Sequence, residues 1–146
     1  MLVPQMRFYG SLDRVLWPIV TATAKPDFES PVVNTDHRGH RVTRVETATA
    51  RSDSAPDGAA FLLGGSYAFG VGASDDASTL AAALWRRTGV PYVNLAIRAA
   101  NSAQELVAVL PFAERETTFI VCSGLNNLAT ARGATGLDPL FWPDAP

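Results

Sequence analysis

The stretch FLLGGSYAFGVGA, residues 61–73, is an apolar run that closes on two glycines and a serine, with a further pair, Gly70 and Gly72, just beyond. This pattern is typical of a buried strand that ends in a sharp turn and presents a hydroxyl to solvent. We therefore expect Ser66 to be a catalytic nucleophile, or to descend from one. The rest of the chain can be interpreted outward from this turn.

Continuous apolar runs predict strands at residues 59–63, 92–97 and 118–121, and unbroken runs of this kind fit strands buried on both faces. Helical segments are expected between them, over residues 78–88 and 102–110. The order β-α-β-α-β with short loops predicts a parallel sheet with right-handed crossovers, and therefore an α/β fold. The ligand crevice of such a sheet lies beyond the carboxyl ends of its strands.

Local signals mark the ends of both helices. The first is expected to begin near Asp75, Asp76 and Ser78 and to end at Gly89. The second is expected to begin at Ser102, with Glu105 at the capping-box spacing. Its apolar face is expected to consist of three residues that precede the stop at the following proline: Leu106, Val109 and Leu110.

The first third of the chain has a weaker pattern. We expect a short surface helix over residues 11–19, a turn at 36–39 and one strand near 41–48. His37 and His40, in DHRGHR, are expected to be surface turn residues. Residues 1–52 are thus predicted to form an N-terminal extension with an edge strand, and residues 53–146 the main α/β domain.

Composition excludes several classes of protein. With 146 residues, 47% hydrophobic and 18% charged, the chain fits one globular domain of ordinary size. A net charge of −2 disfavours nucleic-acid and membrane-surface binding. Cys122, the only cysteine, excludes an intrachain disulfide and is expected to be a buried small hydrophobe. No apolar run reaches the ~20 residues of a membrane span, so a cytoplasmic protein without metal or cofactor is expected.

Other uses of a glycine-rich turn fit poorly. A phosphate loop needs a lysine after its last glycine, whereas Lys25, the only lysine, precedes the turn. A dinucleotide fingerprint needs a third glycine where this chain has Asp75. A nucleophile turn remains, although two glycines before a serine also occur in purely structural turns.

Three blocks in order, GGSYAFGVGA, VNLAIRAANSAQEL and FIVCSGLNNL, resemble the first conserved blocks of the SGNH (GDSL-like) hydrolases. This family comprises serine esterases, lipases, thioesterases and carbohydrate deacetylases with a flavodoxin-like α/β fold. The earlier VNTDHRG resembles the lead-in of some members. The resemblance covers roughly residues 30–130 and implies an acyl-ester or acyl-thioester substrate.

The resemblance assigns roles to individual residues. It makes Ser66 the nucleophile and its backbone N–H one oxyanion donor, and it makes the Asn126 side-chain amide another. The family's middle donor is a glycine N–H, which corresponds to Ala99, or to Ala100 if the loop is shifted. Alanine keeps this donor provided that the backbone does not need a positive φ.

Three further residues are candidate substrate contacts. Gly65 and Asn127 stand where family members have aspartate, and Arg98 could bind an acidic substrate group. In a simpler interpretation, Asn127 and its neighbour cap a helix and Arg98 is a solvated loop residue.

The family's Asp-x-x-His block, which supplies the general base, is not found in this sequence, whose two histidines precede Ser66. We therefore expect a second chain, or the other half of a split enzyme, to supply the histidine and aspartate and to complete the fold. Two alternatives stay open. The chain is a non-catalytic pseudoenzyme or binding subunit, or His37 or His40 serves as a substitute base.

Overall fold

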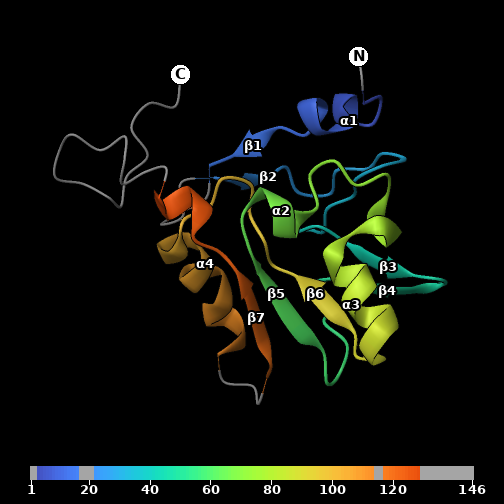
Figure 1. Ribbon diagram of the computed structural model, residues 1–146, viewed down its shortest axis with the longest axis vertical. Helices are drawn as coiled ribbons and strands as arrows, with labels where there is room; N and C mark the ends of the chain where they lie inside the picture. Colours follow the sequence, from blue (N-terminus) through green and yellow to red (C-terminus); the bar gives the residue numbers. More distant parts are fainter. Residues whose placement is uncertain (1–2, 17–21, 114–116, 129–146) are drawn as a thin grey trace, which may run out of the picture.

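A computed structural model describes residues 3–16, 22–113 and 117–128 (Figure 1). The chain forms a mixed α/β structure whose centre is a three-stranded parallel sheet in the order β6-β5-β7. These strands are β5 (Ala60–Gly64), β6 (Tyr92–Asn94) and β7 (Phe119–Cys122). The predicted α/β class and the parallel sheet are confirmed.

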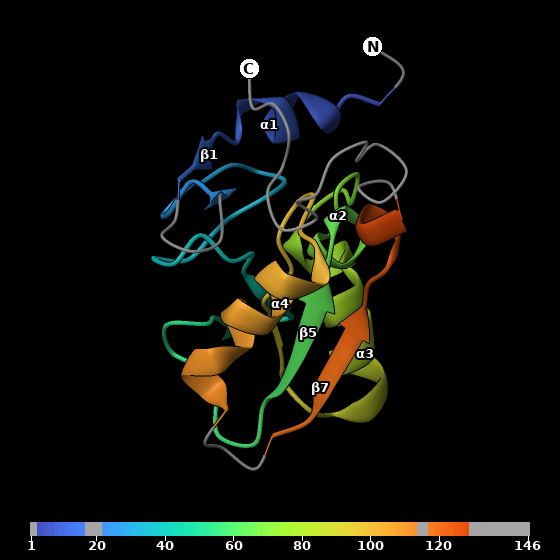
Figure 2. The ribbon, with the colours of Figure 1, turned by 90° about the vertical axis from the view of Figure 1, so that its left-hand side faces the viewer.

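The central strand β5 is buried throughout because helices cover both faces of the sheet. Ala60 and Leu62 pack in a cluster that includes α3 (Leu80–Thr88). Phe61 and Leu63 point to the other face, where α4 (Ser102–Val109) and Phe112 pack. Figure 2 shows α4 and α3 on opposite sides of β5, and α2 (Ser66–Phe69) directly beyond its carboxyl end.

The two outer strands differ from the prediction in extent and burial. β6 ends at Asn94, three residues early, because the Asn94 side-chain oxygen accepts the N–H of Ala96 at 3.0 Å. The chain nevertheless stays beside β5, since Ile97 N–H donates to Gly64 C=O at 3.0 Å. β7 was predicted to be buried on both faces, which is wrong: among the described strands it pairs with β5 alone, and Val121 is 61% exposed.

Both helices begin at a different cap from the predicted one. The Thr79 hydroxyl accepts the N–H of Ala82 and caps α3, while Asp75 caps a short 3-10 helix, Asp76–Ser78, that precedes it. Gly89 ends α3 in the left-handed conformation, as predicted. The capping box of α4 joins Asn101 to Gln104 and lies one residue earlier than Ser102 and Glu105.

The face that α4 buries is only in part the predicted one: Val109 packs against the cluster of Phe61 and Leu63, as expected, but the two leucines do not. Leu106 and Leu110 are 64% and 60% exposed, whereas Glu105 and Ala108 are buried. Packing of Phe112 against Phe61, with ring centroids 4.5 Å apart, fixes this orientation. Pattern alone had assigned the more apolar residues to the core.

The N-terminal region contributes small elements around the sheet. These are α1 (Met6–Ser11), β1 (Arg14–Val15), β2 (Thr23–Ala24), β3 (Thr43–Val45) and β4 (Ala48–Ala50). The helix expected over 11–19 is wrong where the chain is described, because the helix ends at Ser11 and β1 follows. The single strand expected over 41–48 is a hairpin, β3-β4, since the chain reverses at Glu46 with φ +52°.

Residues on both sides of position 52 share one core. Tyr9, Leu12 and Val33 pack in the same cluster as Leu62. The turn at 36–39 is confirmed by the bond from Gly39 N–H to Asp36 C=O, at 2.9 Å. A boundary at residue 52 stays a prediction. None of the helices in the described ranges is both long and apolar enough to cross a membrane.

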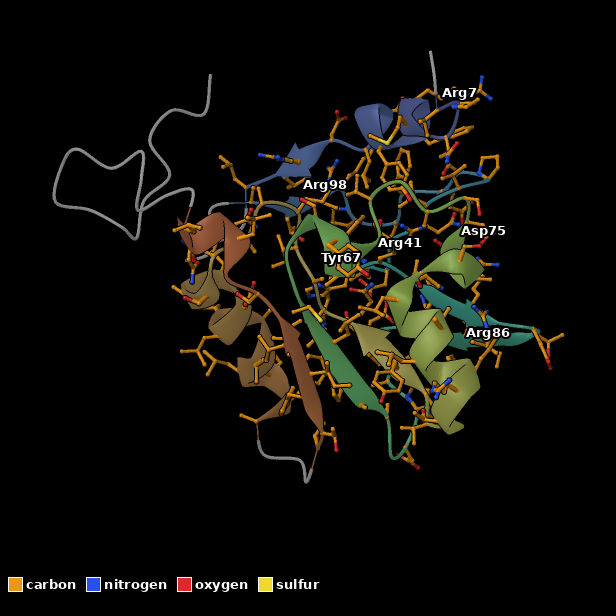
Figure 3. The ribbon with its side chains drawn as sticks, in the orientation of Figure 1. Arg7, Arg41, Tyr67, Asp75, Arg86 and Arg98 are labelled. Atoms are coloured by element: carbon orange, nitrogen blue, oxygen red, sulfur yellow. The ribbon has the colours of Figure 1, made fainter. Side chains whose placement is uncertain are left out.

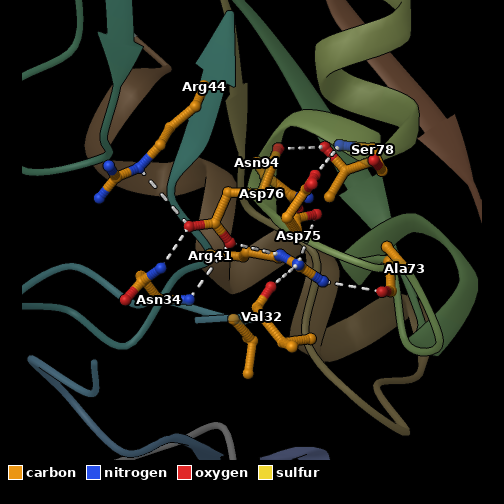
Figure 4. Close-up of polar contacts among 12 residues, drawn as sticks. Val32, Asn34, Arg41, Arg44, Ala73, Asp75, Asp76, Ser78 and Asn94 are labelled. Atoms are coloured by element: carbon orange, nitrogen blue, oxygen red, sulfur yellow. Dashed lines mark hydrogen bonds and ion pairs between the residues drawn. The ribbon is translucent and has the colours of Figure 1, made fainter. Parts of the chain in front are cut away.

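A buried ion pair joins the N-terminal region to the sheet. Arg41 is fully buried, and its Nε donates to Asp76 Oδ1 at 3.1 Å. Asn34 Nδ2 donates to Asp76 Oδ2 at 2.6 Å, and Arg44 Nε lies 3.6 Å from the same carboxylate (Figure 4). The carboxylate is therefore paired and hydrogen-bonded on both oxygens.

Replacing Arg41 by methionine should destabilise the fold by about 3–5 kcal/mol, because a buried carboxylate and several carbonyls would lose their cationic donor. Arg44→Met is the matched control: Arg44 contacts the same carboxylate but its side chain is 54% exposed, so a loss below about 1 kcal/mol is expected. Urea unfolding of both variants measures the difference. An equal loss of unfolding free energy in the two variants would show that burial of the Arg41–Asp76 pair does not increase its contribution to stability.

Candidate active site

Ser66 begins α2 directly after β5, on a turn made possible by two glycines. A Cβ on Gly64, whose φ is +146°, would come within 2.3 Å of the Cys122 carbonyl oxygen. The carboxyl ends of β5 and β7 are therefore in close contact at this point. The Ser66 side chain is exposed, as expected for a hydroxyl presented at a strand end.

Asn126 joins the three loops that follow the three strands. Its Nδ2 donates to the Ala100 carbonyl at 2.7 Å, in the loop after β6. The same atom lies so close to Gly65 that a Cβ there would approach it to 2.5 Å. Glycine in place of the family's aspartate thus leaves the space that the Asn126 amide occupies beside the Ser66 turn.

Ala99 adopts the backbone conformation that glycine usually takes. It has φ +64°, in a turn closed by the bond from Ala100 N–H to Ile97 C=O at 3.1 Å. The third residue of such a turn favours glycine when φ is positive, because a Cβ is strained there. The position does need a positive φ, and Ala99 adopts it despite its Cβ, so the backbone N–H is kept at a cost in strain and not, as expected, without one.

A cavity of about 130 Å³ lies between the ends of β5 and β7. Ser66, Glu105, Ser123 and Asn126 contribute polar side chains to it. The other lining residues are Gly65, Tyr67, Cys122, Gly124 and Leu125. Cys122 is half-buried, not fully buried as predicted. Two predicted site residues, Ser66 and Asn126, and one predicted contact, Gly65, thus meet at one cavity.

Glu105 is the acidic member of this cavity and is only 5% exposed. Burial raises the pKa of its carboxyl, and a hydrogen bond with the Ser123 hydroxyl acts in the opposite direction. Its Oε1 is buried and has no hydrogen-bond partner among the described residues. A carboxyl group in this state binds a proton more tightly than an exposed glutamate.

Two of the predicted substrate contacts lie elsewhere. Arg98 donates to the carbonyls of Tyr9, at 3.1 Å, and Leu12, and thus points toward the segment of α1 and β1 (Figure 3). Asn127 exchanges two hydrogen bonds, each of 3.0 Å, with Ser102 at the start of α4. Neither side chain lines the cavity, and their roles toward a substrate stay predictions.

The two histidines line a different cavity, of about 310 Å³, together with Arg38 and Phe112. His37 is exposed and lies 3.0 Å from Asp27. His40 was predicted to be a surface residue, which is wrong: it is buried, and burial lowers its pKa although Asp36 opposes this. The structure does not bring either histidine to the cavity of Ser66.

A larger hollow, about 610 Å³, adjoins Asp75, Asp76 and Arg44. There Asp76 already binds Asn34 and Arg44, so we assign the site to the smaller cavity that holds the serine. Within the described ranges, no three His, Cys, Asp or Glu side chains gather as metal ligands would.

A scan against protein-family models found no matching family, and a search of curated proteins found no match. The resemblance to the SGNH hydrolases therefore rests on the residues themselves.

Sequence reasoning missed Glu105 as a member of the site, whereas Ser123 belongs to the polar cluster 123–127 that is expected after the third strand. Glu105 was interpreted as a capping-box residue, although its spacing to Ala108 and Phe112 places all three on one helix face, as the structure has them. That periodicity was the available signal. It was outweighed by the greater hydrophobicity of Leu106 and Leu110.

Replacing Ala99 by glycine should stabilise the protein by about 0.5–1 kcal/mol, because relief of the left-handed conformation gains about 1–2 kcal/mol and the added freedom of the unfolded chain offsets about 0.5–1 kcal/mol of it. Ala73→Gly is the control, since Ala73 is also half-buried in a loop but has no positive φ. In Ala73→Gly, the added freedom of the unfolded chain should lower the stability of the folded protein by about 0.5–1 kcal/mol. Thermal unfolding of both variants measures whether each substitution raises or lowers stability. A loss of stability in Ala99→Gly would show that the backbone of Ala99 is not strained.

Glu105→Gln should stabilise the protein more at pH about 8 than at pH about 4. A raised folded-state pKa means that the native protein binds the proton more tightly than the unfolded chain. Stability is therefore lost as pH rises from the unfolded pKa through the folded one. Denaturant unfolding at both pH values measures this, with exposed Glu46→Gln as the control. A difference independent of pH would contradict it.

Proposed function

We propose that this chain carries the nucleophile and oxyanion groups of an SGNH-type serine hydrolase, acting in ester or thioester hydrolysis or acyl transfer. The proposal includes a flavodoxin-like sheet that a second chain completes, and a cytoplasmic location. It rests on the polar residues that lie beyond the carboxyl ends of the parallel strands.

One observation carries the proposal: Asn126 lies between the Gly65–Ser66 turn and the Ala100 carbonyl. The three sequence blocks that suggested a hydrolase therefore meet through one side chain. A chance set of strand-end residues has no reason to converge on the amide that the resemblance assigns to the oxyanion hole. The positive φ of Ala99, at the position of the family's glycine, supports the same alignment.

The mechanism follows from these positions. Ser66 Oγ attacks the acyl carbonyl carbon, and charge develops on the carbonyl oxygen. The N–H of Ser66 and the Asn126 amide donate to this oxygen, and the resemblance assigns the third donor to the N–H of Ala99, which is not among the residues that line the cavity. Such donors act strongly in a site that excludes water.

Exposed apolar side chains support a partner protein. They lie on α4, on β7 and on the helical residues 125–128, which follow β7 in the chain; α4 is drawn beside β7 in Figure 1. The most exposed are Leu106, Val121 and Leu125, at 64%, 61% and 80%. β7 is also an edge strand, so a second chain could add a strand beside it and supply the histidine and aspartate.

The alternative is a pseudoenzyme that uses the same cavity only to bind. The hydrogen bond from Asn126 to the Ala100 carbonyl favours this alternative, because it gives the amide a structural role that needs no catalysis. Reactivity of Ser66 separates the two functions.

A fluorophosphonate probe tests the nucleophile, because it forms a stable adduct with activated serines. We expect mass spectrometry of the full chain, alone or with any chain that co-purifies, to place the adduct on Ser66, and Ser66→Ala to abolish it. No adduct under either condition would leave only the binding function.

Asn126→Ala should slow labelling of Ser66 about 100- to 1000-fold, the usual effect of removing one oxyanion donor. Asn127→Ala is the comparison: its side chain lies outside the cavity, and a smaller effect is expected. Rates come from time courses of adduct formation, with thermal unfolding to confirm that both variants fold. Equal effects of the two substitutions would argue against an oxyanion role for Asn126.

A further inference from the structure

Glu105 differs from the other buried acids of this chain. Asp76 is satisfied by Arg41 and Asn34. Asp36 accepts bonds from the backbone N–H groups of its neighbours and from the N–H and hydroxyl of Ser52, at 2.7 and 2.6 Å. Glu105 has a hydrogen bond with Ser123, yet its Oε1 has no partner in the described part of the chain.

The described residues that share the cavity of Glu105 provide no counter-charge. No lysine, arginine or histidine is among the residues that line its cavity. The other titratable groups there are the Cys122 thiol and the Tyr67 phenol. A buried carboxyl without a cationic partner is unfavourable for folding, and an apolar residue or a glutamine would fill the same space without that cost. Such a group calls for an explanation other than stability.

The reactive hydroxyl lies at the same place. Ser66 and Glu105 both line one cavity of only about 130 Å³, so the residue that carries the carboxyl group shares this small space with the serine. Glu105 comes from α4, whose orientation is fixed at one end by Asn127 and at the other by the ring of Phe112. The carboxyl is thus held on a regular element and not on a mobile loop.

We propose that Glu105 is the proton acceptor for Ser66, so that this chain contains its own general base. The inference rests on the proposed function of Ser66 and replaces only the source of the base, which the sequence had assigned to a histidine of a second chain. Ser123 acts as a positioning residue, since its hydroxyl holds the carboxyl group.

The chemical step balances within the chain and substrate. Ser66 Oγ forms a bond to the acyl carbon while its proton passes to the Glu105 carboxylate, and the carbonyl electron pair moves to the oxygen. Collapse of this intermediate breaks the bond to the leaving alcohol or thiol, which takes the proton from Glu105. Water then repeats the sequence on the acyl-serine, with Glu105 again accepting and returning the proton.

Burial suits the carboxyl to this task. It raises the pKa of Glu105 toward the working pH, and a general base accepts protons more readily as its pKa approaches that pH. Exposed carboxylates, with pKa values near 4.3, are weaker bases at neutral pH.

The test is the rate at which the full chain alone forms the Ser66 fluorophosphonate adduct between about pH 4 and pH 9. There the serine oxygen bonds to phosphorus, fluoride leaves and Glu105 takes the proton. We expect the wild-type rate to rise with pH along one titration above the ordinary glutamate range. Glu105→Gln should label about 100-fold more slowly and lose that inflection.

Three further variants sharpen the test. Glu105→Asp keeps a carboxyl and should retain the inflection at a reduced rate. Ser123→Ala should shift the inflection to higher pH, because the hydrogen bond with Ser123 lowers the pKa of Glu105. Glu46→Gln, exposed at the β3-β4 turn, should behave as wild type. Thermal unfolding confirms that each variant is folded.

The outcomes separate the two proposals. Labelling of Ser66 in Glu105→Gln at the wild-type rate and with the wild-type pH profile would overturn the role of Glu105 and leave Ser66 as the nucleophile. Labelling that requires an added partner chain would do the same, because the base would then come from outside. Absence of any Ser66 adduct, with or without a partner, would overturn both.

Discussion

The buried guanidinium of Arg41 is the interaction on which the other parts of this structure depend. Its Nη1 donates to Gly70 C=O at 2.7 Å, and its Nη2 to the carbonyls of Val32 and Asp75 at 2.8 and 3.0 Å. With the Asp76 carboxylate it links a segment before the sheet to the end of α2 and the start of the 3-10 helix. A fully buried charge persists only when it is both paired and saturated with hydrogen bonds, which is the case here.

This arrangement also limits where Ser66 can lie. A Cβ at Gly70, whose φ is +87°, would come within 3.0 Å of Arg41 Nη1, so the guanidinium lies against the residue that ends α2. One turn separates that residue from Ser66, whose carbonyl accepts the Gly70 N–H at 3.1 Å. The nucleophile turn is therefore held from two sides, by β5 before it and by Arg41 after it. Rigid placement of this kind is what a reactive hydroxyl requires.

Local chemistry made the centre of the fold predictable. The parallel sheet, the turn before Ser66 and the end of α3 at Gly89 all follow from apolar runs and from glycine at strand and helix ends. Features that depend on distant partners did not follow. Arg41 lies in DHRGHR, a polar run that indicates a surface turn, and its carboxylate partner is 35 residues away. The hairpin at Glu46 was missed because a non-glycine residue with positive φ leaves no sequence signal.

In the candidate site, too, the residues that depend on tertiary contacts could not be predicted from the sequence. Ser66, Gly65 and Asn126 could be placed because each follows a strand in the same parallel sheet. Glu105 could not, since its role depends on which face of α4 turns inward, and tertiary contacts at Phe112 decide that against the more hydrophobic face. The two buried acids thus differ: Asp76 is paired with Arg41, whereas no basic residue is among the described residues that line the cavity of Glu105 and Ser66. A protein that only had to fold would gain from replacing Glu105, and this conflict between local cost and position is the strongest physical sign that the cavity serves chemistry.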